Sequence, residues 1–155
     1  MHVLLAALLI GVIAGLRTFT APTAVSWAAR LGWIPLAETH LAFMGSTITA
    51  CILTLLALAE IVLIDPRPGT PSRKGAQGFG ARIVFGGLSG ATIGVSAGSL
   101  WLGLLLGIVG AVIGTYGGAA FRARLAAAFG KDLPAAITED VVAVVGAFLI
   151  VAYLA

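Results

Sequence analysis

A long apolar stretch decides the fold of this chain: residues 82–120 read "RIVFGGLSGATIGVSAGSLWLGLLLGIVGAVIGTYGGAA". A helix needs about 20 apolar residues to cross the hydrocarbon core of a bilayer. The stretch is therefore too long for one crossing and long enough for two. We expect it to form a tight hairpin of two membrane-spanning helices that turns near residues 96–99.

The composition of the whole chain is that of a membrane protein. Of its 155 residues, 60% are hydrophobic and 10% are charged, whereas about a quarter of the residues of a soluble domain are charged. We expect one integral membrane domain over residues 1–155, with the lipid bilayer as its surroundings. No basic cluster is interleaved with aromatic residues, so nucleic acid is not an expected partner. The single cysteine, Cys51, excludes a disulfide framework and a cysteine-based metal motif within the chain.

Three further apolar runs flank the central stretch: residues 3–30, 41–64 and 135–155. The first run is interrupted at residues 17–22, where a charge and a proline occur. It has no lysine or arginine before its apolar part and no clear cleavage site. We therefore expect a retained membrane span with a break in its helix, and not a signal peptide.

The basic residues predict the orientation of the spans. Six of the nine lysines and arginines lie in two loops, residues 65–81 and 121–133. If residues 82–120 form a hairpin, both loops lie on one face, which the positive-inside rule makes cytoplasmic. The predicted fold is an all-α, polytopic transmembrane helix bundle with about five crossings and a cytoplasmic N-terminus. A single long helix over residues 82–120 would leave four crossings and place the two basic loops on opposite faces.

Glycine forms the strongest pattern in the sequence. Residues four apart lie on one face of a helix, and glycines recur at this spacing within the central stretch. In a membrane such a face allows two helix backbones to approach closely. We favour this packing role over a pore or ligand site lined by glycine. The predicted packing positions are Gly86, Gly90, Gly94, Gly98, Gly110, Gly114 and Gly118.

The segment "GLRTFTAPTA", residues 15–24, places a charge inside the first apolar run. A charge at the centre of a bilayer costs about 2.5–3.5 kcal/mol on insertion scales. Pro22 removes a backbone donor and disfavours a helical conformation at the residue before it. One hypothesis is an unwound turn that presents Arg17, Thr18 and Thr20 to an anionic or polar ligand. The alternative is an arginine that reaches the headgroups or satisfies the break internally.

Acidic residues near the cytoplasmic ends of two spans form a second candidate site. Glu60 and Asp65 end one predicted span, and Glu139 and Asp140 begin another. These carboxylates could bind a cation or protons, or they could form structural ion pairs. The expected partner of Glu60 in the second case is Arg73, Arg82 or Arg122.

The candidate ligand- or ion-binding residues are Arg17, Thr18, Thr20, Glu60, Asp65, Arg82, Glu139 and Asp140. Neither histidine belongs to a spaced ligand motif, so we expect no transition metal and no cofactor. Thr70 and Ser72 lie beside basic residues and could hold a phosphate. No histidine accompanies them, so we expect no catalytic residue and no enzymatic activity.

Several motifs together resemble a family of small bacterial inner-membrane proteins that is defined only as a domain of unknown function. They are "GLRTFTAP" (15–22), "AEIVLIDPRPGTPSR" (59–73), "ARIVFGGLSGA" (81–91), "GAVIGTYGG" (110–118) and "EDVVAVVGAFLIV" (139–151). The resemblance covers almost the entire chain. It implies a multi-pass protein of the bacterial inner membrane and brings no substrate, cofactor or catalytic residue.

We expect a small transporter or channel-like protein that acts on a small ion or polar solute. A chain of this length can hardly enclose a pathway alone, so this function implies a homo-oligomer. The alternative is a structural or accessory subunit that packs against other membrane subunits through its glycine faces. A third hypothesis, an enzyme acting on a lipid headgroup, depends only on the loop that contains Thr70 and Ser72.

Overall fold

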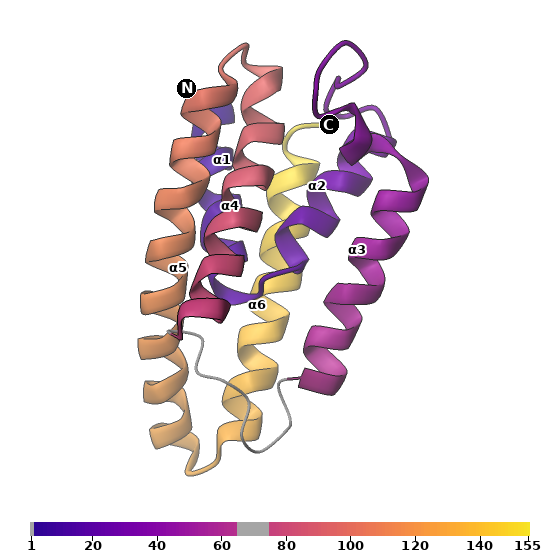
Figure 1. Ribbon diagram of the computed structural model, residues 1–155. Helices are drawn as coiled ribbons and strands as arrows, with labels where there is room; N and C mark the ends of the chain where they lie inside the picture. The colour runs from indigo at the N-terminus through magenta and orange to yellow at the C-terminus, as the bar shows by residue number, and fades with distance from the viewer. Residues whose placement is uncertain (1, 65–74) are drawn as a thin grey trace.

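The protein is an all-helical bundle (Figure 1). The computed structural model describes residues 2–64 and 75–155, and no strand occurs among them. In chain order the elements are α1 (His2–Leu16), α2 (Thr20–Arg30), η1 (Ala42–Gly45), α3 (Thr47–Ala59), η2 (Glu60–Ile64), α4 (Ala76–Ser96), α5 (Leu100–Phe129) and α6 (Asp132–Ala152). The η1 element is a short 3₁₀ helix, and η2 is a π-helical turn that continues α3. The predicted all-α class is confirmed.

Three of the helices, α4, α5 and α6, are long and apolar enough to cross a membrane. The apolar helices over residues 3–16 and 47–62 are shorter. These lengths agree with a membrane protein, because about 20 residues of helix span the hydrocarbon core. The predicted number of five crossings is not confirmed.

The central stretch forms the expected hairpin of α4 and α5. The chain turns at residues 97–99, where Gly98 has a φ of +66°, a left-handed conformation that glycine adopts readily. Gly98 therefore belongs to the turn and not to the packing face on which it was predicted. The predicted loop at residues 121–133 is wrong in extent. Helix α5 continues to Phe129, and the turn into α6 is short, with Gly130 at a φ of +68°.

Glycine allows α5 to pack closely against two helices. A Cβ atom at Gly90 or Gly94 of α4 would lie under 3.0 Å from the backbone of α5. A Cβ at Gly110 or Gly114 of α5 would lie equally close to the backbone of α1. Only glycine tolerates such an approach, so the predicted packing role is observed at these positions. Gly86 makes a similar contact with Ala111, and Gly118 is buried in α5.

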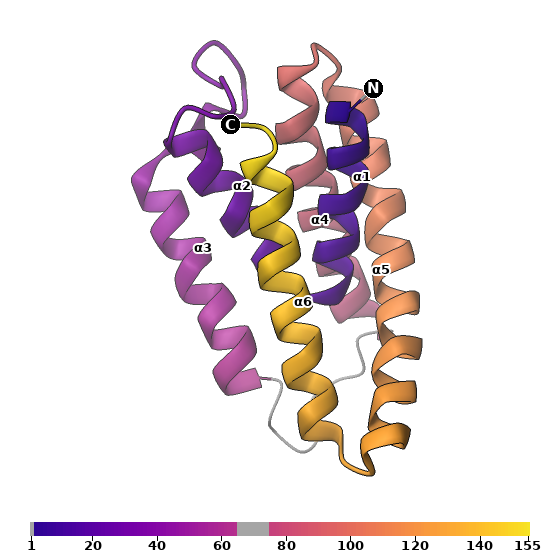
Figure 2. The ribbon, with the colours of Figure 1, turned by 180° about the vertical axis from the view of Figure 1, so that it is seen from behind.

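The first apolar run does not cross the bundle as one broken span. Helix α1 runs from the N-terminus to about the middle of α5, since its Gly15 packs against Ala111 and Gly114. The chain then reverses, and α2 returns toward the end of the bundle where α1 began (Figures 1 and 2). The N-terminal end of α1 therefore lies at the end opposite the α5–α6 turn. The prediction that the N-terminus shares a face with the basic loop at residues 121–133 does not fit this arrangement, and residues 65–74 of the other basic loop lie outside the described residues.

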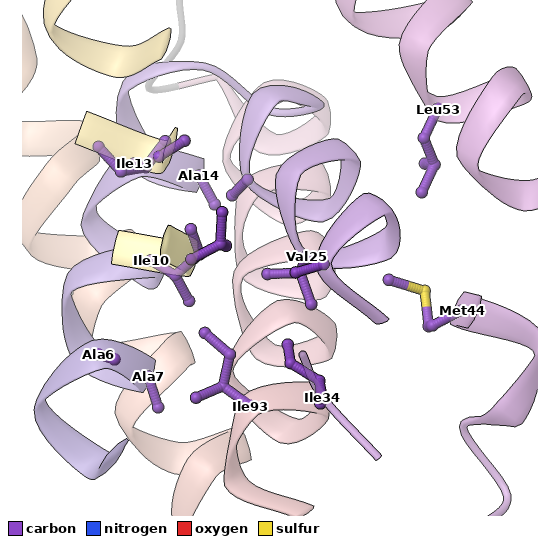
Figure 3. Close-up of a cluster of buried hydrophobic side chains, with 14 of the residues drawn as sticks. Ala6, Ala7, Ile10, Ile13, Ala14, Val25, Ile34, Met44, Leu53 and Ile93 are labelled. Carbon is purple, nitrogen blue, oxygen red and sulfur yellow. The ribbon is translucent and has the colours of Figure 1, made fainter. Parts of the chain in front are cut away.

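The apolar core lies where the returning helix meets its neighbours. Figure 3 shows Ile10 of α1, Val25 of α2 and Ile93 of α4 converging in this region. Ile34 and Met44, from the segment between α2 and α3, cover the same core and are 1% exposed each. Because α2 is packed on α1, α4 and α6, the break between α1 and α2 is held inside the protein.

Candidate binding site at the break in the first helix

The break between α1 and α2 comprises residues 17–19. It lies before Pro22, the residue from which a break was predicted. Pro22 lies in the first turn of α2, where its missing N–H costs little because the first N–H groups of a helix have no partner within that helix. Two helix ends therefore meet inside the protein, and each exposes backbone groups that need partners.

Glu60 satisfies the start of α2. Its Oε1 accepts a hydrogen bond from the Thr18 N–H at 2.9 Å, and its Oε2 accepts one from the Phe19 N–H at 3.0 Å. Glu60 as a whole is 7% exposed. A negative charge at a helix N-terminus is favoured by the helix dipole. Glu60 is thus an N-terminal cap supplied by another helix.

Arg82 of α4 satisfies the end of α1. Its Nε donates to the Gly15 carbonyl at 3.1 Å, and its Nη1 donates to the Gly78 carbonyl at 3.1 Å. A positive charge at a helix C-terminus is also favoured by the dipole. At the break, each helix end therefore meets a side chain whose charge is opposite in sign to the partial charge of that end.

The expected pairing of Glu60 with an arginine is wrong for the residues that the structure describes. Its carboxylate is bound to backbone N–H groups, and Arg82 and Arg122 have other contacts. Arg73 lies outside the described residues.

Arg17 follows α1 directly and is 2% exposed. Its Nε forms an ion pair with Oδ1 of Asp140 at 2.5 Å. The side chain of Asp140 is 20% exposed, so one member of the pair is buried and the other is open in part. Asp140 is eight residues into α6, about 12 Å along the helix from Asp132. This pair joins the break in the first helix to α6.

A second group of charges lies nearer the α5–α6 turn. Arg122 binds Asp132 through two hydrogen bonds, of 3.0 Å from Nε and 2.6 Å from Nη2. Its Nη1 is also 3.6 Å from Oε2 of Glu139, which is fully buried. Arg122 was predicted only as a loop residue and a partner for Glu60. The ten-residue spacing between Arg122 and Asp132, with Gly130 between them, is the signal that could have indicated this contact across a helical turn.

A cavity of about 350 Å³ opens beside these charges. Its lining residues come from η2, α5 and α6: Ile61, Arg122, Asp132, Leu133, Ala136, Ile137 and Asp140. Asp140 therefore contacts both this cavity and the buried Arg17. The cavity volume lies in the lower part of the range of about 300–1,000 Å³ that is usual for small-molecule sites.

The structure brings most of the predicted site residues together. Contacts around the break join Arg17 to Asp140, Thr18 to Glu60, and Arg82 to Gly15. Glu139 lies next to Asp140 in sequence and is held by Arg122. Thr20 begins α2 and is buried, and it lines a different, apolar groove. Asp65, Thr70 and Ser72 lie outside the described residues.

Among the described residues, no group of three or more histidine, cysteine or acidic side chains is placed to hold a metal ion. The acidic groups instead pair with arginines: Asp140 with Arg17, and Asp132 and Glu139 with Arg122. Such an arrangement can bind a small ion or polar solute only by exchanging its own ion pairs for contacts with that solute.

No family model, curated protein or solved structure matches this chain. The functional argument therefore depends on the residues and the geometry described above.

Proposed function

We propose that this protein is a small transporter or channel-like protein of the bacterial inner membrane that acts on a small ion or polar solute. The observation that carries the proposal is the position of Asp140. Its carboxylate lines the 350 Å³ cavity and pairs with Arg17. Arg17 lies at the break between α1 and α2, inside the bundle. Broken helices that bring charges to the middle of a membrane are a recurrent feature of transporter binding sites.

The cost of burying these charges supports a role in function. An ionisable side chain within the hydrocarbon core costs a few kcal/mol, and such residues commonly mark an ion or substrate path. Glu60 and Arg82 are explained by the helix ends that they cap. The ion pair of Arg17 and Asp140 joins the break to α6, and Asp140 also lines the cavity, so we assign the proposed role to this pair.

The mechanism follows from the partial exposure of this pair. A solute that enters the cavity meets the open side of Asp140 and competes with Arg17 for its carboxylate. Release of Arg17 would loosen the link between the break and α6. Because α2 and α6 also pack on one another, this exchange couples solute binding to the position of α2.

The proposal includes a homo-oligomer. The described lining of the cavity comes from η2, α5 and α6, and we propose that a second copy of the chain completes the path. Helices α4 and α5 also carry large apolar side chains that are half or more exposed, among them Val84, Leu105 and Ile113. A symmetric assembly could use these faces and close the path between copies.

A paired replacement tests whether the ion pair is the binding site. Exchanging a buried ion pair for apolar residues of similar size is often neutral for stability. The double variant Arg17→Met, Asp140→Leu is therefore expected to fold and to lose at least nine-tenths of the flux. Flux is measured as the swelling of proteoliposomes under gradients of potassium chloride and of glycerol.

The matched control is Arg124→Gln, which removes an exposed arginine from α5 and should leave swelling unchanged. Wild-type flux in the folded double variant would show that the pair is structural, and would contradict the proposed site. Wild-type proteoliposomes that swell no faster than empty liposomes under either gradient would contradict transport of these solutes.

The alternative is a non-catalytic structural or accessory subunit of a larger membrane complex. Its main support was the number of glycine faces. Gly90, Gly94, Gly110 and Gly114 are occupied by helices of the same chain, so these faces are not free to receive another subunit. We therefore favour transport, and co-purification of the native protein with unrelated membrane subunits would favour the alternative.

A further inference from the structure

An apolar groove with a volume of about 370 Å³ lies between α2, α3 and α6. It is separate from the charged cavity, although Ile61 lines both. Its lining residues are Thr20, Thr23, Ala24, Trp27, Ala28, Leu31, Trp33, Thr54, Ala57, Leu58, Ile61, Val144, Ala147, Phe148 and Val151. The groove thus follows α2 from its first residue to its end.

The groove is flanked by large apolar side chains that are exposed. Leu58 on α3 is 54% exposed, and Phe148 on α6 is 61% exposed. Large apolar side chains this exposed on two membrane helices are covered by lipid or protein, because water disfavours such a surface. A molecule dissolved in the bilayer can therefore reach the groove from the side.

One residue that lines the groove has a polar group without a partner among the described residues. The Oγ1 atom of Thr20 is buried and makes no hydrogen bond there. Thr23 and Thr54 differ, because their hydroxyls donate to the carbonyls of Phe19 and Ala50 four residues earlier. The break in the first helix deprives Thr20 of that local bond. A buried hydroxyl without a partner costs about 1–3 kcal/mol, so this atom indicates a missing polar partner.

The lining of the groove restricts the chemistry of that partner. None of the described residues that line it is charged. A charged head group placed there would be desolvated without a counter-ion, which is costly. A hydroxyl or carbonyl can bond to Thr20, since a threonine hydroxyl both donates and accepts. The aromatic rings of Trp27, Trp33 and Phe148 suit a hydrocarbon chain.

We propose that this groove binds one uncharged membrane amphiphile, a lipid with a hydroxyl or carbonyl head group and a hydrocarbon chain. The side chain of Thr20, whose hydroxyl is buried in this structure, turns toward the groove to bond to the head group, and the chain lies along α2 toward Trp33. This site is independent of the proposed transport, because none of its contacts involves the ion pair of Arg17 and Asp140.

Photolabelling in lipid nanodiscs tests the proposal. The full-length protein is reconstituted in phosphatidylcholine nanodiscs with a trace of a long-chain alcohol that carries a diazirine in mid-chain. Mass spectrometry is expected to locate the label on groove residues of α2 and α6. The variant Thr20→Val, which keeps the shape and removes the hydroxyl, should reduce this labelling by roughly three- to ten-fold.

Three further variants make the result decisive. Thr20→Ser retains the hydroxyl and should retain the labelling. Thr138→Val removes a hydroxyl that bonds to its own helix outside the groove, and should leave the labelling unchanged. Leu58→Trp fills the groove and should abolish the labelling.

Three results would overturn the proposal. One is wild-type labelling in folded Thr20→Val, and another is label spread evenly over all the lipid-facing helices. The third is a covalent dimer formed through Leu58→Cys in a Cys51→Ser background, which would show that a second copy occupies the groove.

Discussion

Single charged side chains hold the two halves of the broken helix in place. Glu60 accepts two N–H groups at the start of α2, and Arg82 donates to a carbonyl at the end of α1. Each charge opposes the partial charge of the helix end that it meets, so both contacts are favourable. The reversal of the chain at Arg17 therefore leaves these backbone groups satisfied.

Removing the Glu60 cap should destabilise the fold. Hydrogen bonds to a charged group contribute about 1.5–3 kcal/mol each. We expect Glu60→Ala to lower the free energy of unfolding by about 3 kcal/mol, and Glu60→Gln to lower it less because an acceptor remains. Thermal unfolding in detergent, followed by size-exclusion chromatography, measures the effect.

The control for this prediction is Glu38→Ala, since Glu38 is an exposed acidic residue between α2 and η1. It should leave the unfolding midpoint unchanged. Equal midpoints for Glu60→Ala and Glu38→Ala would show that the cap contributes nothing to stability.

Among the helices, α5 makes the closest backbone contacts with its neighbours, α1 and α4. It packs on α4 through one set of glycines and on α1 through another. A lipid environment supplies little hydrophobic drive between helices, so close van der Waals contact between backbones provides the stability. The glycine spacing is what makes that contact possible.

A single added methyl group should distinguish packed glycines from open ones. A Cβ at Gly107 would lie under 3.0 Å from the backbone of Gly86, whereas nothing lies within 4 Å of one at Gly117. We expect Gly107→Ala to cost about 1–3 kcal/mol of unfolding free energy. Gly117→Ala should be neutral or stabilising by up to about 1 kcal/mol. Unfolding midpoints of both variants in detergent provide the comparison, and equal losses would contradict the packing argument.

At the scale of the whole molecule, the return of α2 places the two ends of the chain together. The N-terminal end of α1 and the C-terminal end of α6 lie at one end of the bundle, and the α5–α6 turn lies at the other (Figures 1 and 2). The five-crossing topology predicts instead that the N-terminus lies on the same side as that turn.

Cysteine accessibility decides between these topologies. In a Cys51→Ser background, His2→Cys and Lys131→Cys should react with an impermeant maleimide from opposite sides of sealed, oriented vesicles. Ala155→Cys should react from the same side as His2→Cys. Labelling of His2→Cys and Lys131→Cys from one side would support five crossings and contradict the arrangement of α1 and α2 described here.

The local patterns of the sequence predicted the helical hairpin and the glycine contacts well. Both depend on residues close together along the chain, such as Gly90 and Gly94, whose spacing specifies a helix face. The break near Arg17 was also predicted, from its charge and from Pro22. The partner of Glu60 was not, because Thr18 and Phe19 lie about forty residues away along the chain. An ion pair was predicted instead, because Glu60 was expected to lie near the basic loops and their arginines.

The sequence by itself determined that the chain is an all-helical membrane protein with a hairpin at residues 82–120 and a break in its first helix near Arg17. Hydrophobicity and helical periodicity are local properties, so they can be read without the fold. Only the tertiary structure decided that α2 turns back, that Glu60 caps it, and that Asp140 meets Arg17. A broken helix can continue or reverse with the same local sequence. The choice depends on which distant side chains satisfy its exposed backbone groups and which helices bury its apolar face.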